Sequence, residues 1–242
     1  MNSEILYLKN AYLKEEKGIV NAVSTEFGIE LDRSIFYPRG GGQPGDQGLL
    51  QLLNKNIEIV ETIKGPNGEI YLIPSNTDDL LELKKGDEVV QNIDWQKRFK
   101  YMRMHTALHL LSVCLPFPVT GGQITFEKGR LDFDMPESPD KEELEKRLNE
   151  LIEADYTVSY SSISQEELSK KPELVKTMSV KPPTNADFVR LVRIGDDNQI
   201  IDLQPCGGTH VITTSEIGIA QITKIEKKGR INRRVSVILH DK

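Results

Sequence analysis

Two pairs of potential metal ligands stand far apart in this sequence of 242 residues. His105 and His109 are four residues apart, and Cys206 and His210 repeat that spacing much later in the chain. Residues four apart on a helix share one face, so both imidazoles of the first pair can reach the same ion. Imidazole and thiolate ligands suit tetrahedral zinc. The sequence therefore predicts one zinc ion bound by these four residues.

This zinc assignment depends on taking the two pairs together. A histidine pair on a helix is more often packed or solvated than bound to metal, and a lone cysteine near a histidine is an equally weak signal. Together the pairs use three of the four histidines and one of the two cysteines. Four protein ligands indicate a closed structural site, whereas three ligands and a water indicate a catalytic one, and the sequence is compatible with both. Thr106 stands where helix-borne metalloprotease motifs carry a glutamate, so that general base is missing.

The composition is that of an ordinary globular protein, with 38% hydrophobic and 28% charged residues. The net charge of −6 argues against a basic coat for nucleic acid but allows local basic surfaces. No apolar run approaches the roughly 18–20 residues of a membrane helix, and residues 1–10 lack the features of a signal peptide. We therefore expect a cytoplasmic protein without membrane contact. Cys114 is interpreted as a buried core thiol, and His240 is assigned no role.

Short apolar stretches separated by turn formers fill the first part of the chain. The even spacing of these stretches predicts a small antiparallel barrel or sandwich. We expect this β-barrel-like domain to cover residues 1–92 and to include a glycine-rich stretch at residues 37–48. The predicted strands are residues 18–23, 28–31, 48–53, 57–63 and 69–73.

The pattern becomes helical after residue 93. Residues 95–114 contain neither glycine nor proline, and their apolar spacing predicts a helix with one buried face that Pro116 and Pro118 end. A second helix is predicted to start at Ser138 as N-cap, with Pro139 in the first helical position. Its apolar stripe is formed by Leu144, Leu148, Leu151 and Ile152.

A shorter helix and several strands complete the second part. Ser164 and Glu167 match a capping box at the start of a short helix. Strands are predicted at residues 123–126, 130–133, 188–194, 199–203, 217–225 and 235–239. Helices and strands in separate runs indicate an α+β domain over residues 93–242.

The ligand pairs and several glycine-containing motifs together resemble a known family. His-Thr-Ala-Leu-His at residues 105–109 and Cys-Gly-Gly-Thr-His at residues 206–210 are similar to the editing domain shared by alanyl-tRNA synthetases and the freestanding AlaX proteins. The glycine-rich stretch at residues 37–48 resembles the motif of the domain that precedes it. Residues 120–124 and 130–134 are similar to the stretch after the first histidine pair. These fragments occur in the family's order across both halves of the chain.

The resemblance implies a member of the medium-length AlaX class. It implies a barrel-like first domain followed by a two-layer α+β editing domain of the threonyl/alanyl-tRNA synthetase type. The implied activity is zinc-dependent deacylation, in trans, of alanine tRNA that carries serine or glycine. The chain has no room for an aminoacylation domain. The glycine-rich stretch also lacks the Lys-Ser/Thr ending of a P-loop, so no ATP requirement is expected.

Five further residues are assigned roles in this reaction. Thr120 is predicted to sense the serine hydroxyl, because a polar group left unsatisfied penalises a ligand that lacks it, and Gln123 is predicted to line the same pocket. The backbone amides of Gly207 and Gly208 are candidate oxyanion donors. Asp202 is a candidate for orienting a ligand histidine. The alternatives are a turn threonine, glycines that serve only the loop conformation, and an aspartate that caps a strand end.

The predicted contacts with tRNA come from two basic segments and the glycine-rich loop. Basic side chains neutralise phosphates, and glycines let the backbone approach the acceptor end closely. Solvated charged faces and a tight barrel turn are the alternative interpretations. The residues are Gly41, Gly42, Gln43, Asp46, Arg98, Arg103, Lys227, Lys228, Arg230 and Arg233.

Three other functions are compatible with these residues. A zinc-stabilised RNA-binding module without catalysis would use the same four ligands. Threonyl-tRNA synthetases carry related pairs in their editing domain, although the glycine-rich first domain and the Cys-Gly-Gly-Thr-His string favour the alanine system. A general metallohydrolase of small esters or amides would act without tRNA.

Overall fold

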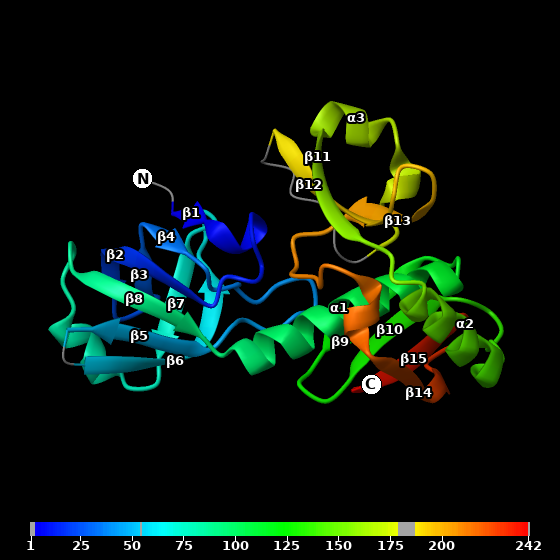
Figure 1. Cartoon of the computed structure of the whole chain (residues 1–242), viewed down its shortest axis with the longest axis horizontal. Helices are drawn as coiled ribbons and strands as arrows, with labels where there is room; N and C mark the ends of the chain where they lie inside the picture. The colour runs from blue at the N-terminus through cyan, green and yellow to red at the C-terminus, as the bar shows by residue number, and fades with distance from the viewer. Residues whose placement is uncertain (1–2, 54, 179–186, 242) are drawn as a thin grey trace. The chain divides into compact units, whose positions relative to one another are not determined.

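The computed structural model describes residues 3–53, 55–178 and 187–241 (Figure 1). The chain divides into two compact units, Met1–Lys100 and Tyr101–Lys242, and the division falls within helix α1 (Trp95–Cys114). The expected α+β class with an N-terminal barrel is confirmed. Among the described residues, no helix combines the length and apolarity that crossing a membrane requires.

Six antiparallel strands close into a barrel in the first unit, in the order β2-β3-β7-β6-β5-β8. Alternate residues of these strands point inward, so Ile57 and Ile59 of β6 and Ile70 and Leu72 of β7 are buried. The strands are β2 (Glu15–Ser24), β3 (Gly28–Leu31), β5 (Gly48–Leu52), β6 (Lys55–Lys64), β7 (Ile70–Pro74) and β8 (Glu88–Ile93). β8 and the short strands β1 (Glu4–Ile5) and β4 (Arg33–Ser34) are additional to those that the sequence predicts.

Two short 3-10 helices also belong to the first unit, η1 (Leu6–Leu8) and η2 (Thr77–Glu82). The first turn of α1 is joined to the barrel by the side chain of Arg98, which is completely buried. Its guanidinium donates to the Asp46 carboxylate at 2.9 Å and to the carbonyl oxygens of Ala11 and Ile35 at 2.8 and 2.6 Å. This buried ion pair fixes the start of α1 against its own barrel.

The second half of α1 is surrounded by protein. Every residue from 101 to 112 is buried, so the expectation of a single buried face is wrong for this part of the helix. On one side Gly129 approaches Met104 and Leu108 so closely that a Cβ would collide with Met104. On another side the Thr106 hydroxyl lies 3.1 Å from Nδ1 of His210. The helix ends at Cys114, ahead of Pro116, as predicted.

Two sheets build the second unit. The four-stranded sheet has the order β14-β15-β10-β9, and the three-stranded sheet has the order β11-β12-β13. The first comprises β9 (Val119–Ile124), β10 (Gly129–Asp134), β14 (Ile219–Lys227) and β15 (Asn232–His240). The second comprises β11 (Val158–Ser164), β12 (Phe188–Gly195) and β13 (Ile200–Pro205), of which β11 was not predicted.

Helix α2 (Lys141–Glu153) begins two residues later than a Ser138 cap requires. Asp140 is the N-cap instead, and its carboxylate accepts a hydrogen bond from the amide of Glu143 at 2.9 Å. Further along the helix, the Asn149 side chain bonds both backbone groups of Ala220 in β14. The helix thereby covers the outer edge of the four-stranded sheet, which would otherwise offer unpaired backbone groups.

The three-stranded sheet packs a small core on one face. Ile163, Val189 and Leu191 are buried there with Leu168 of the short helix α3 (Gln165–Ser169). The predicted capping box of Ser164 and Glu167 starts this helix and is confirmed. The single-turn helices η3 (Pro172–Leu174) and η4 (Thr214–Ile217) complete the unit. The opposite face of this sheet carries the side chains that meet α1.

We expect Arg98→Met to destabilise the folded chain by roughly 3–5 kcal/mol, because it leaves a buried carboxylate without its partner. Urea denaturation followed by circular dichroism measures the change. Arg39→Met is the matched control, since the Arg39–Glu61 ion pair is exposed and exposed pairs contribute about 0–1 kcal/mol. Equal stability of the two variants would contradict a structural role for the buried pair.

Candidate metal centre

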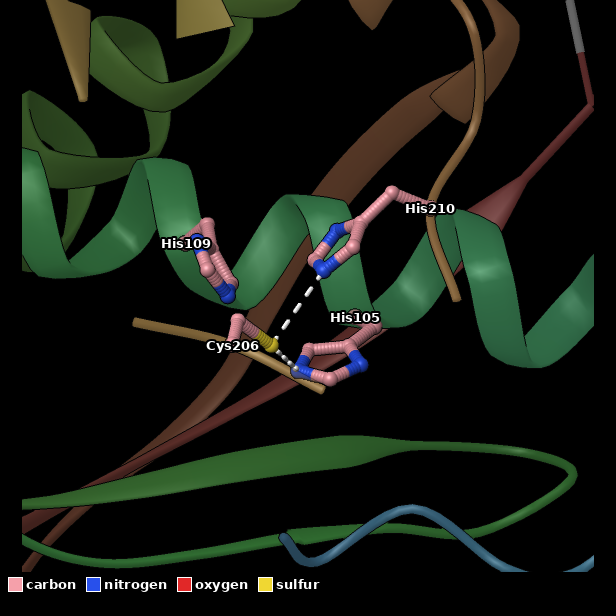
Figure 2. A group of neighbouring side chains, drawn as sticks. All are labelled: His105, His109, Cys206 and His210. Carbon is pink, nitrogen blue, oxygen red and sulfur yellow. Dashed lines mark hydrogen bonds between the residues drawn. The ribbon is translucent and has the colours of Figure 1, made fainter. Parts of the chain in front are cut away.

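His105 and His109 of α1 meet Cys206 and His210 of the loop that follows β13 (Figure 2). One ligand atom from each residue lies within 4.8 Å of all the others. The Cys206 sulfur is 3.5 Å from Nε2 of His105 and 3.4 Å from Nε2 of His210. Tetrahedral zinc, with bonds of about 2.3 Å to sulfur and 2.0–2.1 Å to nitrogen, separates such atoms by about 3.5 Å. The group could therefore hold one metal ion.

Hydrogen bonds at the far side of two imidazoles direct their Nε2 atoms into the cluster. Nδ1 of His109 lies 2.9 Å from an oxygen of Asp202. Nδ1 of His210 lies 3.1 Å from the Thr106 hydroxyl, which itself donates to the carbonyl oxygen of Met102 at 2.9 Å. The hydroxyl is thus an acceptor toward His210, which places the ring proton on Nδ1 and a lone pair on Nε2.

The Asp202 carboxylate is the centre of a buried polar network. The contact with a ligand histidine that the sequence suggested for it is made to His109. Gln204 donates to the same carboxylate oxygen at 2.7 Å, and the Lys176 ammonium lies 2.5 Å from the other oxygen. Sequence spacing gave no signal for Lys176 or Gln204. Gln204 lies one residue beyond the predicted strand 199–203 and two residues before Cys206.

The surroundings of His210 and Cys206 favour the deprotonated forms that bind metal. Burial, with a further contribution from His105, lowers the pKa of His210 to about 3, so this imidazole is neutral at pH 7. Burial raises the pKa of the Cys206 thiol, but the neighbouring histidines outweigh burial and hold that pKa well below its usual range. Burial also raises the pKa of Asp202, yet His109 and Lys176 lower it to about 2.

His109 holds its proton more tightly than a free imidazole. Burial lowers its pKa, but the hydrogen bond to Asp202 and the neighbouring Cys206 thiolate outweigh this and raise the pKa to about 9. The same carboxylate that raises this pKa also makes the imidazole a stronger ligand once the proton is displaced.

Arg190 of β12 holds the loop that carries Cys206. Its Nη1 donates to the carbonyl oxygens of Cys206 and Gly208, at 2.9 and 3.0 Å. The amide of Gly208 points at the Cys206 sulfur, 3.4 Å away. This amide thus donates to a ligand sulfur, and its service to an oxyanion stays a prediction. Gly207 is exposed and no atom crowds its Cα.

Thr120 and Gln123 lie within β9 and not in a turn. The Thr120 hydroxyl accepts a hydrogen bond from Asn232 at 2.9 Å, and the Gln123 carbonyl accepts from Arg130. These hydrogen bonds connect both residues to their own sheet. Cross-strand pairing places Asn232 beside Asp134, on the face of the sheet opposite the buried Phe133.

Of the residues predicted to contact tRNA, five are exposed and five are buried. Gly41 and Gly42 are exposed, with φ angles of 57° and 85° that favour glycine, and a Cβ added at Gly41 would meet no atom within 4 Å. Lys227, Lys228 and Arg230 are exposed at the turn between β14 and β15.

The other five are buried, which argues against direct contact of their side chains with tRNA. The physical reason is the same for each: the polar side chain is enclosed by the unit that it stabilises. Arg103 donates to the carbonyl oxygens of Ile217 and His240, and Arg233 donates to that of Asn232. The five residues are Gln43, Asp46, Arg98, Arg103 and Arg233.

Family models match both units of the chain. Residues 2–97 match the class II (A) tRNA synthetases, and residues 189–236 match the threonyl and alanyl tRNA synthetase second additional domain. The second match includes Cys206 and His210, so the loop half of the cluster lies in a region typical of these synthetases.

Similar proteins span the whole chain. An alanyl-tRNA editing protein AlaX-M of Methanosarcina acetivorans is 35% identical over 99% of this chain and 100% of its own length. A second AlaX-M, of Saccharolobus solfataricus, is 34% identical over 96% of this chain and 97% of its own. An AlaX-L of Pyrococcus horikoshii is 35% identical over 94% of this chain but only 55% of its own length.

We expect Asp202→Asn to weaken metal binding about 10- to 100-fold, the usual cost of removing a carboxylate that orients a ligand histidine. Competition with a chromophoric chelator measures the affinity. Asp197→Asn is the matched control, because Asp197 is an exposed aspartate paired with Arg193 on the neighbouring strand end. Unchanged affinity in the Asp202 variant would remove its assigned role.

Proposed function

This chain belongs to the AlaX family of alanyl-tRNA editing proteins, and from that premise we propose that it deacylates wrongly charged alanine tRNA. The reaction is hydrolysis of the ester between the amino acid and the terminal ribose. The proposed substrates are alanine tRNAs charged with serine and with glycine. The observation that carries the proposal is the four-residue cluster His105, His109, Cys206 and His210, brought together from two distant segments.

We propose zinc as the ion that these four residues hold. Three imidazoles and a thiolate are borderline-to-soft ligands, and the two sulfur–nitrogen distances of 3.5 and 3.4 Å suit a tetrahedral ion. An ion held by all four residues would stabilise the fold, and it would supply Lewis-acid polarisation for ester hydrolysis only by accepting the substrate as a further ligand.

The chain's own residues orient the site. Asp202 holds His109, Thr106 holds His210, and Arg190 holds the loop of Cys206. Preorganised ligands and donors lower the barrier because they need no rearrangement during the reaction. The exposed amide of Gly207 is the backbone donor that we assign to the developing oxyanion.

Selection of serine over alanine requires a polar partner for the serine hydroxyl. We assign this partner to Thr120, whose hydroxyl accepts a hydrogen bond from Asn232 and can still donate its own proton to the substrate. Serine would gain this hydrogen bond, whereas alanine, which lacks the hydroxyl, would not.

We assign contacts with the body of the tRNA to those predicted RNA-binding residues that are exposed. Lys227, Lys228 and Arg230 present positive charge at one turn, where phosphates would bind in a salt-dependent way. Gly41 and Gly42 offer an exposed backbone.

We expect purified protein to remove serine and glycine from alanine tRNA while largely sparing alanyl-tRNA(Ala) and seryl-tRNA(Ser). Release of the labelled amino acid over time measures this. The first control tests the amino-acid pocket and the second tests recognition of the tRNA. Binding of the RNA by folded, zinc-loaded protein without any hydrolysis would replace this proposal with that of a binding module. Hydrolysis of free amino-acid esters at the same rate would indicate a general metallohydrolase.

We expect His109→Ala and Cys206→Ala to lose stoichiometric zinc and to lower deacylation to background, because each removes a ligand. Metal analysis and the deacylation assay are run on the same preparations. Cys114→Ala is the control, since the other cysteine is buried outside the cluster. Full activity in folded, zinc-free variants would exclude a zinc mechanism.

A further inference from the structure

One face of the three-stranded sheet begins at the metal cluster. Residues opposite one another on paired strands share a face, and the register places Tyr160 beside Val192 and Val192 beside Gln204. Asp202 lies two residues before Gln204 and therefore points to the same side. Asp202 and Gln204 both contact His109, which fixes this face against the cluster.

The same face continues away from the cluster with three side chains. Arg190 and Phe188 precede Val192 by two and four residues on β12, so both point to the side of Tyr160. Phe188 is 65% exposed and Tyr160 is 37% exposed, so both present apolar surface to solvent on this face. We call Tyr160, Arg190 and Phe188 the aromatic strip.

The end of the aromatic strip nearest the cluster is held to the metal-binding loop. The Arg190 guanidinium carbon lies 3.9 Å from the centre of the Tyr160 ring. The same guanidinium donates to the carbonyl oxygens of Cys206 and Gly208. Burial raises the pKa of the Tyr160 hydroxyl, and Arg190 and the backbone of His210 oppose this rise, as expected for a phenol beside the loop. Tyr160 is therefore a partly exposed ring, positioned one side chain away from a metal ligand.

We propose that the aromatic strip binds the unpaired 3′ end of the tRNA, with the terminal adenine against Tyr160 and the preceding bases toward Phe188. This inference rests on the proposed function, because it assumes that the reacting ester lies at the metal cluster. The ester is carried by the last ribose, so the last base lies within one nucleotide of it. The nearest partly exposed ring on the face that starts at the cluster is then its stacking partner.

The composition of the strip suits single-stranded RNA. Aromatic rings and guanidinium planes stack on any base, which is how proteins hold unpaired nucleotides. Arg190 adds a positive charge close to where the phosphates would pass. On β12, Phe188 lies four residues from Val192, the residue that pairs with Tyr160. The separation along the strand is about 13 Å, a length that the last few nucleotides can cover.

A fluorescent RNA tests the terminal contact directly. The probe is a stem-loop of the alanine acceptor stem with 2-aminopurine in place of the terminal adenine, whose fluorescence falls when the base stacks. We expect the full-length wild-type protein to quench it, Tyr160→Phe to retain the quenching, and Tyr160→Leu to lose it. Each variant is first shown to carry the wild-type metal content, which separates a lost stacking platform from a disturbed loop.

Kinetics extend the test to the other end of the strip. We expect Tyr160→Leu and Phe188→Leu each to raise KM for seryl-tRNA(Ala) about tenfold with little change in kcat, within the range that loss of one base–aromatic stack produces. Leu81→Ala is the control, since Leu81 is a large exposed apolar residue of the other unit, in η2. Its KM should equal that of wild type.

Two results distinguish failure of this inference from failure of the proposed function. Normal quenching and normal KM in metal-loaded Tyr160→Leu and Phe188→Leu would overturn the RNA-binding role of the aromatic strip and leave the proposed editing reaction unaffected. Failure of the wild-type protein to bind and deacylate charged alanine tRNA would overturn the proposed function, and the strip with it.

Discussion

The convergence of α1 with the loop after β13 is the constraint on which the second unit depends. Four ligand atoms from these two segments lie within 4.8 Å of one another, although the segments are widely separated in sequence. Such a set of imidazoles and a thiolate would be costly to bury without a shared partner, since each is a polar group withdrawn from water. A bound ion would cross-link the helix of one layer to the three-stranded sheet of another, so the energy of binding becomes energy of folding.

The polar groups behind the ligands explain why the cluster can be both buried and ordered. Thr106 links His210 to the backbone of α1, and Asp202 links His109 to β13. Lys176 adds a positive charge beside the Asp202 carboxylate, and this charge offsets the cost of burying the carboxylate. Thr106 belongs to α1 and Asp202 to β13, so both side chains that orient the histidines come from regular elements, while Cys206 and His210 lie in the loop after β13.

The two faces of the three-stranded sheet have different roles: one packs a core, and the other carries the proposed RNA-binding strip. One face is closed by α3 and a small apolar core, while the other carries the residues that hold His109 and, further along, the exposed Tyr160 and Phe188. Exposed aromatic residues of this kind are expensive to keep in water, so a ligand that covers them would be stabilised by the surface it removes from solvent. The metal centre and the aromatic strip are then one continuous surface, with Arg190 joining them.

Local patterns determined the elements and the ligand set of this protein. Helix α1 and its end ahead of Pro116 follow from residue type and spacing, as do five of the six barrel strands and the ligand pairs at i and i+4. Tertiary structure alone decided which polar residues are internal. Arg98 and Arg103 look like surface cations in sequence, yet one pairs with Asp46 and the other with backbone carbonyls. The physical reason is that burial and pairing depend on partners distant in the chain, which spacing cannot reveal. For the same reason the sequence could not place Lys176, Gln204 and Tyr160 near the metal centre. Their positions follow from the packing of the sheets around α1.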